Sequence, residues 1–351
     1  MTSTIDRPGH LMAAEIAEQP NSWRTLLADG VDEINAVARQ IRDRAPRFVQ
    51  FVARGTSDHA ALYAKYLIEI RHGLPAGLVS PSTMTVYGAR PDLTDVLYIA
   101  VSQSGGSPDL VRSVEVAREQ GAVTVAVTNA QSSPLAEAAE FALCVHAGAE
   151  KSVAATKSYT AELLALYLLI EGIAGRDGSA DAAVIPDLAD QVLAGDERIR
   201  EVAQRYRFAS RLVVTGRGYS YPTAREAALK LMETSYLSAQ AFSGADLLHG
   251  PLATVDPQVP VLAVVPRGAG GVAMGPVLDR LAERNADIFG VGARDYVEGL
   301  TGWVGLPEGA PEALSPLLEI IPFQQLALHL ALARGGDPDT PRGLRKVTET
   351  L

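Results

Sequence analysis

The chain has 351 residues, of which 47% are hydrophobic and 21% charged, so it is long and apolar enough for two folded domains. A formal net charge of −10 argues against a general nucleic-acid-binding surface. The single cysteine excludes an internal disulfide bond and a multi-cysteine zinc site. The N-terminal residues contain no apolar signal core, and no uncharged apolar run reaches about 18 residues. We therefore expect a cytoplasmic protein that contacts neither membrane nor nucleic acid.

Two motifs recur at one spacing, which indicates that the chain is an internal duplication. An apolar, β-prone run at 48–53 ends in Arg54-Gly-Thr-Ser57, and a similar run ends in Arg217-Gly-Tyr-Ser220, 163 residues later. The next apolar run of the first half extends to Gly105, and its counterpart extends to Gly268 at the same offset. Two anchors with one offset are the signature of a repeated structural unit.

Apolar strands alternate with amphipathic helices in both halves. The first half predicts, in chain order, a strand at 48–53, a strand at 96–101, a helix at 108–117 and a strand at 123–128. The second half predicts strands at 212–216, 261–265 and 287–291, a helix opening at Pro222, and a helix near Pro276–Arg284. Such alternation is typical of an α/β fold with doubly wound parallel sheets covered by helices on both faces. We expect a helical N-terminal segment (1–30), two domains (31–178 and 199–335), and an extended C-terminal tail (336–351).

A polar, glycine-rich loop lies where doubly wound sheets collect their ligands. Ser102-Gln103-Ser104-Gly-Gly-Ser107 stands between a strand and the helix that begins near Pro108. Its hydroxyls, amide and bare backbone N–H groups suit a phosphate, whereas the alternative, an ordinary helix cap, needs one hydroxyl. Thr56 and Ser57 follow the preceding strand and would add hydroxyls. The equivalent turn of the second half, Arg267-Gly-Ala-Gly-Gly271, has none, so we expect only the first half to bind phosphate.

The helix after Ser220 carries a row of charged residues. Glu226, Lys230 and Glu233 are spaced to share one helical face. A capping box from Thr223 to Glu226 and an exposed Glu226–Lys230 ion pair explain the first two as well as a functional role does. Glu233 lies in an apolar stretch, which we interpret as the middle of the helix, and it is the candidate general base.

His249 and Lys346 are unremarkable taken singly. His249 lies in a turn sequence and Lys346 in the C-terminal tail, where a structural histidine and a solvated lysine are ordinary. The remaining histidines form no pair at metal-ligand spacing, so we expect neither a metal site nor a cofactor.

The motifs are more specific together than separately. In order and spacing they resemble the isomerase half of glucosamine-6-phosphate synthase and the related deaminases of the sugar isomerase (SIS) family. The resemblance runs nearly end to end and rests on His10-Leu-Met-Ala-Ala-Glu-Ile-Ala-Glu-Gln-Pro20, Arg54-Gly-Thr-Ser57, Ser102-Gln-Ser-Gly105, Ser152-Val-Ala-Ala-Thr-Lys157, Glu226-Ala-Ala-Leu-Lys-Leu-Met-Glu233, His249-Gly-Pro-Leu252 and Pro341-Arg-Gly-Leu-Arg-Lys346.

The resemblance implies two tandem SIS domains and a role for each motif. The substrate-binding positions would be Thr56, Ser57, Ser102, Gln103, Ser104, Ser107 and Ala154. Glu233 would move the proton between C1 and C2, and Glu226 and Lys230 would assist at the sugar hydroxyls. His249 would help open the ring, supplied by the neighbouring subunit of a homodimer with shared active sites. Lys346 would lie over the open-chain sugar and could form an imine with a keto-sugar.

Departures from the synthase pattern shape the expected reaction. The glutaminase domain is absent from the sequence, Gly106 replaces an acidic residue, and Asp246-Leu-Leu248 stands where the synthases commonly have Glu-Leu-Lys. The segment Lys151–Lys157 is closer to the deaminases. We expect an enzyme that converts glucosamine 6-phosphate to fructose 6-phosphate and ammonia. The alternatives are a dehydratase acting on N-acetylglucosamine 6-phosphate, a fructosamine-6-phosphate deglycase, and a non-catalytic sugar-phosphate sensor.

Overall fold

The computed structural model describes residues 7–346, which form two compact units. The N-terminal unit comprises residues 21–150 and 157–183. The C-terminal unit comprises residues 7–20, 151–156 and 184–346. The short segment 151–156 therefore belongs to a different unit from the residues on either side of it.

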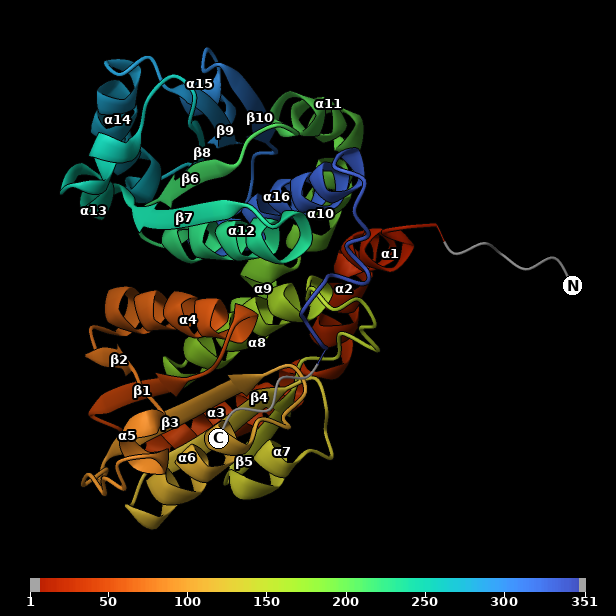
Figure 1. Ribbon diagram of the computed structural model, residues 1–351. Coiled ribbons are helices and arrows are strands. Elements are labelled where there is room, and N and C mark those ends of the chain that lie inside the picture. Colours follow the sequence, from red (N-terminus) through yellow and green to blue (C-terminus); the bar gives the residue numbers. More distant parts are fainter. Residues whose placement is uncertain (1–6, 347–351) are drawn as a thin grey trace, which may run out of the picture. The chain divides into compact units, whose positions relative to one another are not determined.

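The N-terminal unit is a parallel sheet between two layers of helices. Its strands are β1 (Phe48–Val52), β2 (Ala76–Leu78), β3 (Val96–Ser102), β4 (Val123–Thr128) and β5 (Phe141–Cys144), in the spatial order β2-β1-β3-β4-β5. Its helices are α2 (Gln19–Asp29), α3 (Val31–Asp43), α4 (Thr56–His72), α5 (Ser82–Thr85), α6 (Pro108–Glu119), α7 (Pro134–Ala138), α8 (Lys157–Ile173) and α9 (Gly178–Ala182). Figure 1 shows α4 and α8 on one face of the sheet and α6 and α7 on the other.

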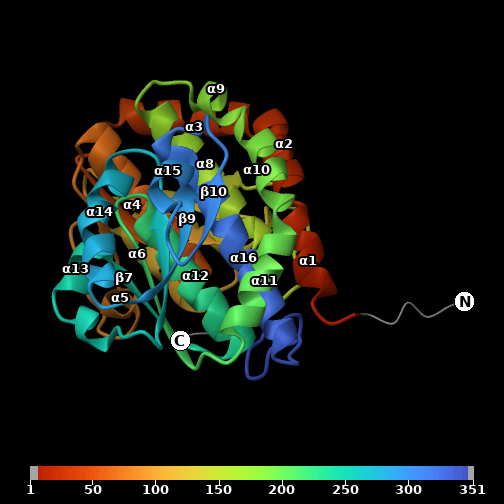
Figure 2. The same ribbon diagram turned by 90° about the horizontal axis from the view of Figure 1, so that it is seen from above.

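The C-terminal unit repeats this plan. Its strands are β6 (Arg211–Gly216), β7 (Ser238–Ser243), β8 (Pro260–Val265), β9 (Asp287–Ala293) and β10 (Gly302–Leu306), all parallel, in the order β10-β9-β8-β6-β7. Its helices are α1 (His10–Ala17), α10 (Ile185–Leu193), α11 (Asp196–Tyr206), α12 (Ser220–Ser235), α13 (Gly244–Leu248), α14 (Ala269–Ala282), α15 (Arg294–Val297) and α16 (Ser315–Ala333), with short 3-10 turns at Pro251–Thr254 and Glu312–Leu314. Figure 2 shows α16 between α12 and α11.

The two sheets have the same topology, which confirms the predicted fold of two doubly wound parallel sheets. In each, the chain moves from the first strand to one edge and then returns to the other side of that strand. This reversal places a topological switch point between β1 and β3 and a second between β6 and β8. Open α/β sheets bind ligands beyond the carboxyl ends of such strands.

Two sequence predictions about elements need correction. We placed a helix near Pro276–Arg284, but α14 begins seven residues earlier, at Ala269, and Pro276 lies inside it. The prediction took the proline as a helix start, its favoured position, whereas it lies here in the helix interior. The edge strands β2, β5, β7 and β10 were not predicted. They are incompletely buried, so they lack the continuous buried apolar run that marked the central strands.

The core of the C-terminal unit includes an unusually apolar helix. The stretch Glu312–Ala333 is long and apolar enough to cross a membrane by length and composition, yet 89% of its apolar window is buried inside the protein. Among the described residues it is the one such stretch. Its burial is that of a core helix, and it packs beside α12, the helix that carries the predicted charged row.

Candidate active site

The loop between β3 and α6 presents hydroxyl groups at the switch point of the N-terminal sheet. Ser102 Oγ accepts the backbone N–H of Gly105 at 3.2 Å, and Ser104 Oγ accepts that of Gly106 at 3.3 Å. Since both oxygens act as acceptors, each O–H proton remains for a ligand oxygen. Ser107 precedes α6, but its side chain makes no capping hydrogen bond. These hydroxyls therefore do not form the ordinary helix cap that was the alternative interpretation.

Glycine at position 105 is required for the shape of this loop. Gly105 has φ = +61°, a conformation that residues with a side chain rarely adopt. A Cβ atom there would lie 2.2 Å from Ser133 Oγ. The carbonyl of Gln103 accepts the backbone N–H of Asn129 at 3.2 Å, which ties the loop to the end of β4. The loop is thus held in a tight, defined form at the start of α6.

The loop after β1 joins the same sheet edge. Arg54 Nε donates to Asp109 Oδ2 at 2.9 Å, linking this loop to the first turn of α6. Thr56 and Ser57 are the first two residues of α4. They therefore lie near the sheet edge where the sequence predicts additional hydroxyl groups. However, Ser57 Oγ donates to the buried Glu162 carboxylate at 2.9 Å. A contact of Ser57 with phosphate would therefore use its backbone N–H or break this bond.

The predicted charged row on α12 is largely buried in the C-terminal unit. The side chains of Glu226 and Lys230 are 0% exposed, and that of Glu233 is 22% exposed. Lys230 Nζ lies 3.3 Å from Glu226 Oε1 and 2.5 Å from Glu233 Oε2. The interpretation of Glu226 and Lys230 as an exposed surface pair is therefore wrong. Burying a charged group is costly in the absence of pairing, and the contacts of Lys230 with both carboxylates offset this cost.

Glu233 lies in the last turn of α12 rather than in the middle of the helix. The helix ends at Ser235 because Tyr236 adopts a left-handed conformation with φ = +55°. The mid-helix placement was wrong because no glycine or proline marks this helix end. The Glu233 carboxylate is partly accessible in this position, whereas the side chains of Glu226 and Lys230 are fully buried.

Lys230 is held in its charged form. Burial lowers the pKa of its ammonium group, but the adjacent carboxylates of Glu226 and Glu233 outweigh burial and set the pKa above its ordinary value. A permanent cation therefore lies between the two carboxylates. Glu233, the partly exposed one of the two, is the candidate proton acceptor.

The predicted capping box at the start of α12 is not formed. Thr223 Oγ1 donates to Glu319 Oε2 at 3.1 Å, and Ser220 Oγ donates to Glu319 Oε1 at 2.9 Å. Ser315 Oγ donates to the same oxygen at 2.6 Å. Burial raises the pKa of Glu319 to about 7, although these three hydroxyls act in the opposite direction. Glu226, the other half of the expected box, faces Lys230 instead.

A buried serine–glutamate pair occurs at the same place in both units. Ser57 opens α4 and bonds Glu162 of α8, and Ser220 opens α12 and bonds Glu319 of α16, each at 2.9 Å. Both carboxylates are 0% exposed. Sequence reasoning missed Glu162 and Glu319. The signal that could have found them is a carboxylate flanked by apolar residues within a long apolar helix, a criterion similar to the one that selected Glu233.

The described end of the C-terminal tail is fixed at two points within the C-terminal unit. Tyr236, directly after α12, has its hydroxyl bonded by the backbone N–H of Arg342 at 2.9 Å, and the Arg342 guanidinium stacks over its ring at 4.1 Å. Lys346 Nζ donates to the backbone carbonyl of Ser152 at 2.7 Å. Ala154, two residues further on, is 1% exposed. The structure thus brings Lys346 onto the segment that contains the predicted substrate-binding alanine.

His249 lies apart from these contacts, at the end of the short helix α13. Its backbone N–H donates to the carbonyl of Asp246 at 3.0 Å, and the residue is exposed. Within residues 7–346, no hydrogen bond or ion pair joins its imidazole to the charged row of α12. His249 is therefore not brought together with Glu233 inside one chain by any hydrogen bond or ion pair of the structure.

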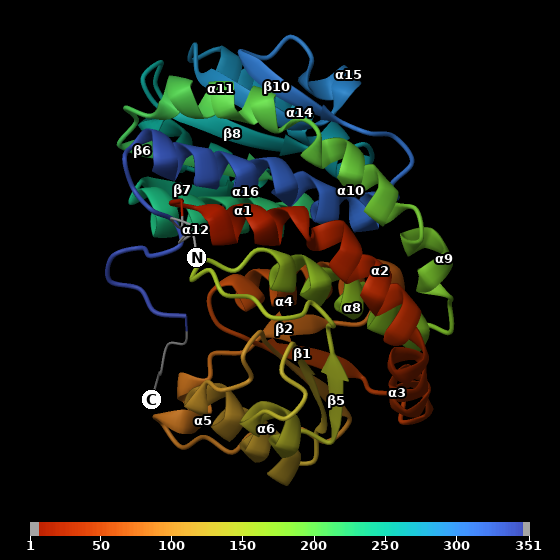
Figure 3. The ribbon, with the colours of Figure 1, turned by 90° about the vertical axis from the view of Figure 1, so that its right-hand side faces the viewer.

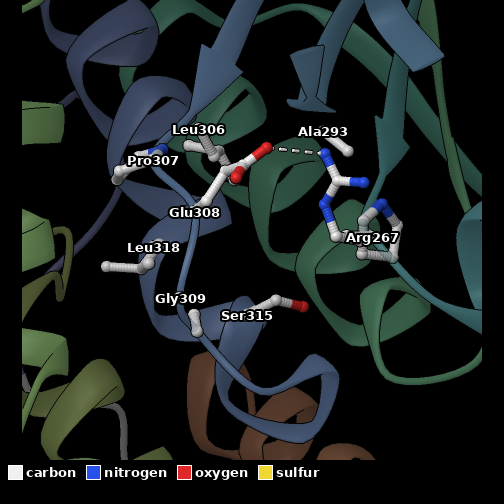
Figure 4. Close-up of a pocket in the computed structure, with 10 residues that line it drawn as sticks. Arg267, Ala293, Leu306, Pro307, Glu308, Gly309, Ser315 and Leu318 are labelled. Carbon is white, nitrogen blue, oxygen red and sulfur yellow. Dashed lines mark hydrogen bonds and ion pairs between the residues drawn. The ribbon is translucent and has the colours of Figure 1, made fainter. Parts of the chain in front are cut away.

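The turn after β8 is already occupied by a carboxylate of the protein. Glu312 accepts the backbone N–H of Ala269 at 2.9 Å and that of Gly270 at 2.7 Å, at the start of α14. Gly268 permits this approach, since a Cβ there would lie 2.1 Å from Glu312 Oε2. Figure 4 shows the adjoining pocket, where Arg267 forms an ion pair with Glu308 at 3.0 Å. The backbone N–H groups at this turn, which correspond in position to those of the β3–α6 loop, therefore bond the carboxylate of Glu312.

The comparisons with known proteins agree on the family. The SIS domain model matches residues 44–172 and 206–288. A glutamine–fructose-6-phosphate aminotransferase (isomerizing) from Thermococcus kodakarensis is 36% identical over 349 residues, covering 96% of this chain and 57% of the relative. The chain belongs to the SIS domain family. It spans little more than half the length of that relative.

Solved structures of SIS proteins share the whole fold. A structure from Silicibacter pomeroyi DSS-3, provisionally called a phosphosugar isomerase, is 36% identical with a TM-score of 0.84, covering 94% of this chain and 99% of that one. A glucosamine-6-phosphate deaminase from Thermotoga maritima has a TM-score of 0.78 at 22% identity, covering 97% and 100%, which is a likeness of fold. The predicted family is confirmed, and so is the expectation of an SIS-family enzyme at the level of its class.

Proposed function

We propose that this SIS protein is a glucosamine-6-phosphate deaminase and isomerase that produces fructose 6-phosphate and ammonia. The observation that carries the proposal is the charged row of α12, in which the buried cation Lys230 lies 2.5 Å from the partly exposed carboxylate of Glu233. Such an arrangement supplies a carboxylate that is oriented by the Lys230 contact and partly exposed. It suits proton transfer between adjacent carbon atoms of a sugar.

The proposed reaction begins with the open-chain form of the sugar. Glu233 removes the proton from C2, and the electron pair moves toward the C1 carbonyl to give an enolamine. Return of the proton to C1 forms an imine at C2, and addition of one water molecule releases ammonia and leaves fructose 6-phosphate. Lys230 bonds and orients the Glu233 carboxylate, and Glu226 holds Lys230 from its other side.

The phosphate of the substrate is proposed to bind at the N-terminal unit. Ser102 and Ser104 retain O–H protons for phosphate oxygens, and the start of α6 contributes backbone N–H groups and a favourable helix dipole. Gln103, Ser107 and Thr56 belong to the same sheet edge. Substrate binding by Ala154, ring opening by His249 of a partner subunit, and imine formation by Lys346 complete the proposal.

Product analysis tests the proposed function directly. The protein is incubated separately with glucosamine 6-phosphate, N-acetylglucosamine 6-phosphate and a fructosamine 6-phosphate, and products are identified by mass spectrometry and an ammonia assay. We expect fructose 6-phosphate and one equivalent of ammonia from the first sugar. An unsaturated product that keeps its N-acetyl group would instead establish a dehydratase, and release of a free amine from the third sugar would establish a deglycase. Binding without turnover of all three would identify a sensor.

A further inference from the structure

Helix α1 is joined to the C-terminal tail through its first turn. Asp339 accepts the backbone N–H groups of Leu11 at 2.9 Å and Met12 at 2.8 Å, and Asp337 accepts that of Gly9 at 2.9 Å. These acidic residues satisfy N–H groups that a helix start leaves without partners. Figure 3 shows α1 lying along α16, in the same unit. The tail that leads to Lys346 is therefore attached to α1.

The same helix holds the segment 151–156 from its other end. Glu15 is 4% exposed, and its carboxylate accepts the backbone N–H of Lys151 and, at 3.2 Å, the backbone N–H of Ser152. The far end of the segment is also fixed, because Gln324 Nε2 donates to the carbonyl of Thr156 at 3.3 Å. A buried carboxylate that accepts two backbone N–H groups fixes the peptide planes to which they belong.

Both backbone polar groups of Ser152 form hydrogen bonds with side chains. Its N–H is bonded by Glu15, and its carbonyl accepts the Lys346 ammonium at 2.7 Å. The N–H belongs to the 151–152 peptide and the carbonyl to the 152–153 peptide, so Glu15 fixes the peptide directly before the one that receives the amine. The Ser152 side-chain hydroxyl is also buried and has no hydrogen-bond partner among the described residues. The contacts of Ser152 with Glu15 and Lys346 are therefore made by its backbone atoms.

We propose that Glu15 is a positioning residue for the amine of Lys346. By fixing the 151–152 peptide it sets the position of Ser152, whose carbonyl, in the next peptide, holds the ammonium group at the segment containing Ala154. The role of Lys346 in the reaction rests on the proposed function, whereas its placement by Glu15 does not. Glu15 itself touches neither substrate nor reacting atoms in this scheme.

The test compares Glu15→Gln with Glu18→Gln, an exposed carboxylate of the same N-terminal region. Glutamine is nearly isosteric and can still accept one N–H group, so folding is retained, but the charge-assisted bonds are lost. In the full-length protein we expect hydrogen–deuterium exchange of the peptide spanning 151–156 to accelerate about tenfold in Glu15→Gln. The acylation rate of Lys346 by acetic anhydride, followed by mass spectrometry, should change in this variant as well. Both rates should stay native in Glu18→Gln.

A kinetic measurement adds a second, separate readout. Borohydride trapping of the Lys346 imine with fructose 6-phosphate and the value of kcat should each fall about ten- to a hundredfold in Glu15→Gln, with KM within about threefold of native. Native exchange and native Lys346 acylation in Glu15→Gln would overturn the positioning role. Altered exchange and acylation, in a protein that turns over no sugar phosphate, would support the placement and reject the proposed function instead.

Discussion

Replacing Glu233 with glutamine separates a chemical role from a structural one. The side chain is 22% exposed and 2.5 Å from Lys230 Nζ, and a glutamine oxygen can keep that hydrogen bond. An amide cannot accept the C2 proton at neutral pH. Since general-base catalysis typically contributes about 10²–10⁴-fold, we expect kcat to fall by about that factor in Glu233→Gln.

The effect on stability should be small, in contrast to the loss of activity. Losing one charge from a partly exposed pair costs about 1 kcal/mol, so the melting temperature should fall by no more than about 4 °C. Lys230→Met is the matched comparison. It leaves the 0%-exposed Glu226 without its cation, and breaking such a buried pair costs about 3–5 kcal/mol. That variant should lose both activity and a much larger part of its thermal stability.

The assay is turnover and isotope exchange in deuterated water. The native protein should introduce deuterium at C2 of recovered glucosamine 6-phosphate or at C1 of fructose 6-phosphate, and Glu233→Gln should not. Substrate affinity, measured by calorimetry, should change by less than about tenfold, because the proposed phosphate contacts lie elsewhere in the chain. Unchanged turnover in Glu233→Gln, or a fall in melting temperature equal to that of Lys230→Met, would refute this assignment of roles.

Three further predictions follow from the same geometry. Ser104→Ala should weaken sugar-phosphate affinity about ten- to a hundredfold by calorimetry, whereas Arg267→Ala should change it by less than about threefold; equal losses would contradict phosphate binding by one half only. Mixing Glu233→Gln with His249→Ala subunits should restore about a quarter of native activity, and no recovery after proven subunit exchange would argue against a shared site. Because burial raises the pKa of Glu319 from 4.5 to about 7, the stability contributed by its neutral form is complete below about pH 4.5 and is lost as pH rises through about 7. Glu319→Gln should remove this pH-dependent loss in the free energy of unfolding, which is on the order of 3 kcal/mol, so the melting temperature should depend less on pH. An unchanged pH dependence would contradict this prediction.

The sequence by itself determined the architecture and the location of the hydroxyl-rich loop after β3. Central strands buried on both faces leave continuous apolar runs, and helices with one covered face leave a period of about 3.6 residues, so both can be read locally. The recurrence of Arg54-Gly-Thr-Ser57 as Arg217-Gly-Tyr-Ser220 revealed the duplication, since the two segments end equivalent strands. The hydroxyls of Ser102 and Ser104 were found because the apolar run of β3 shows where the strand ends, and ligands of parallel sheets bind at that end.

Only the tertiary structure decided how the charges are used. Spacing showed that Glu226 and Lys230 share a helical face, but whether that face meets water or the protein interior depends on segments far away in the chain. Ser220 and Glu319 are 99 residues apart, and Glu15 is 136 residues from the Lys151 N–H that it accepts. Burial and pairing of a polar group depend on which distant segments the fold brings against it. The periodicity of residues along one segment does not show which segments these are.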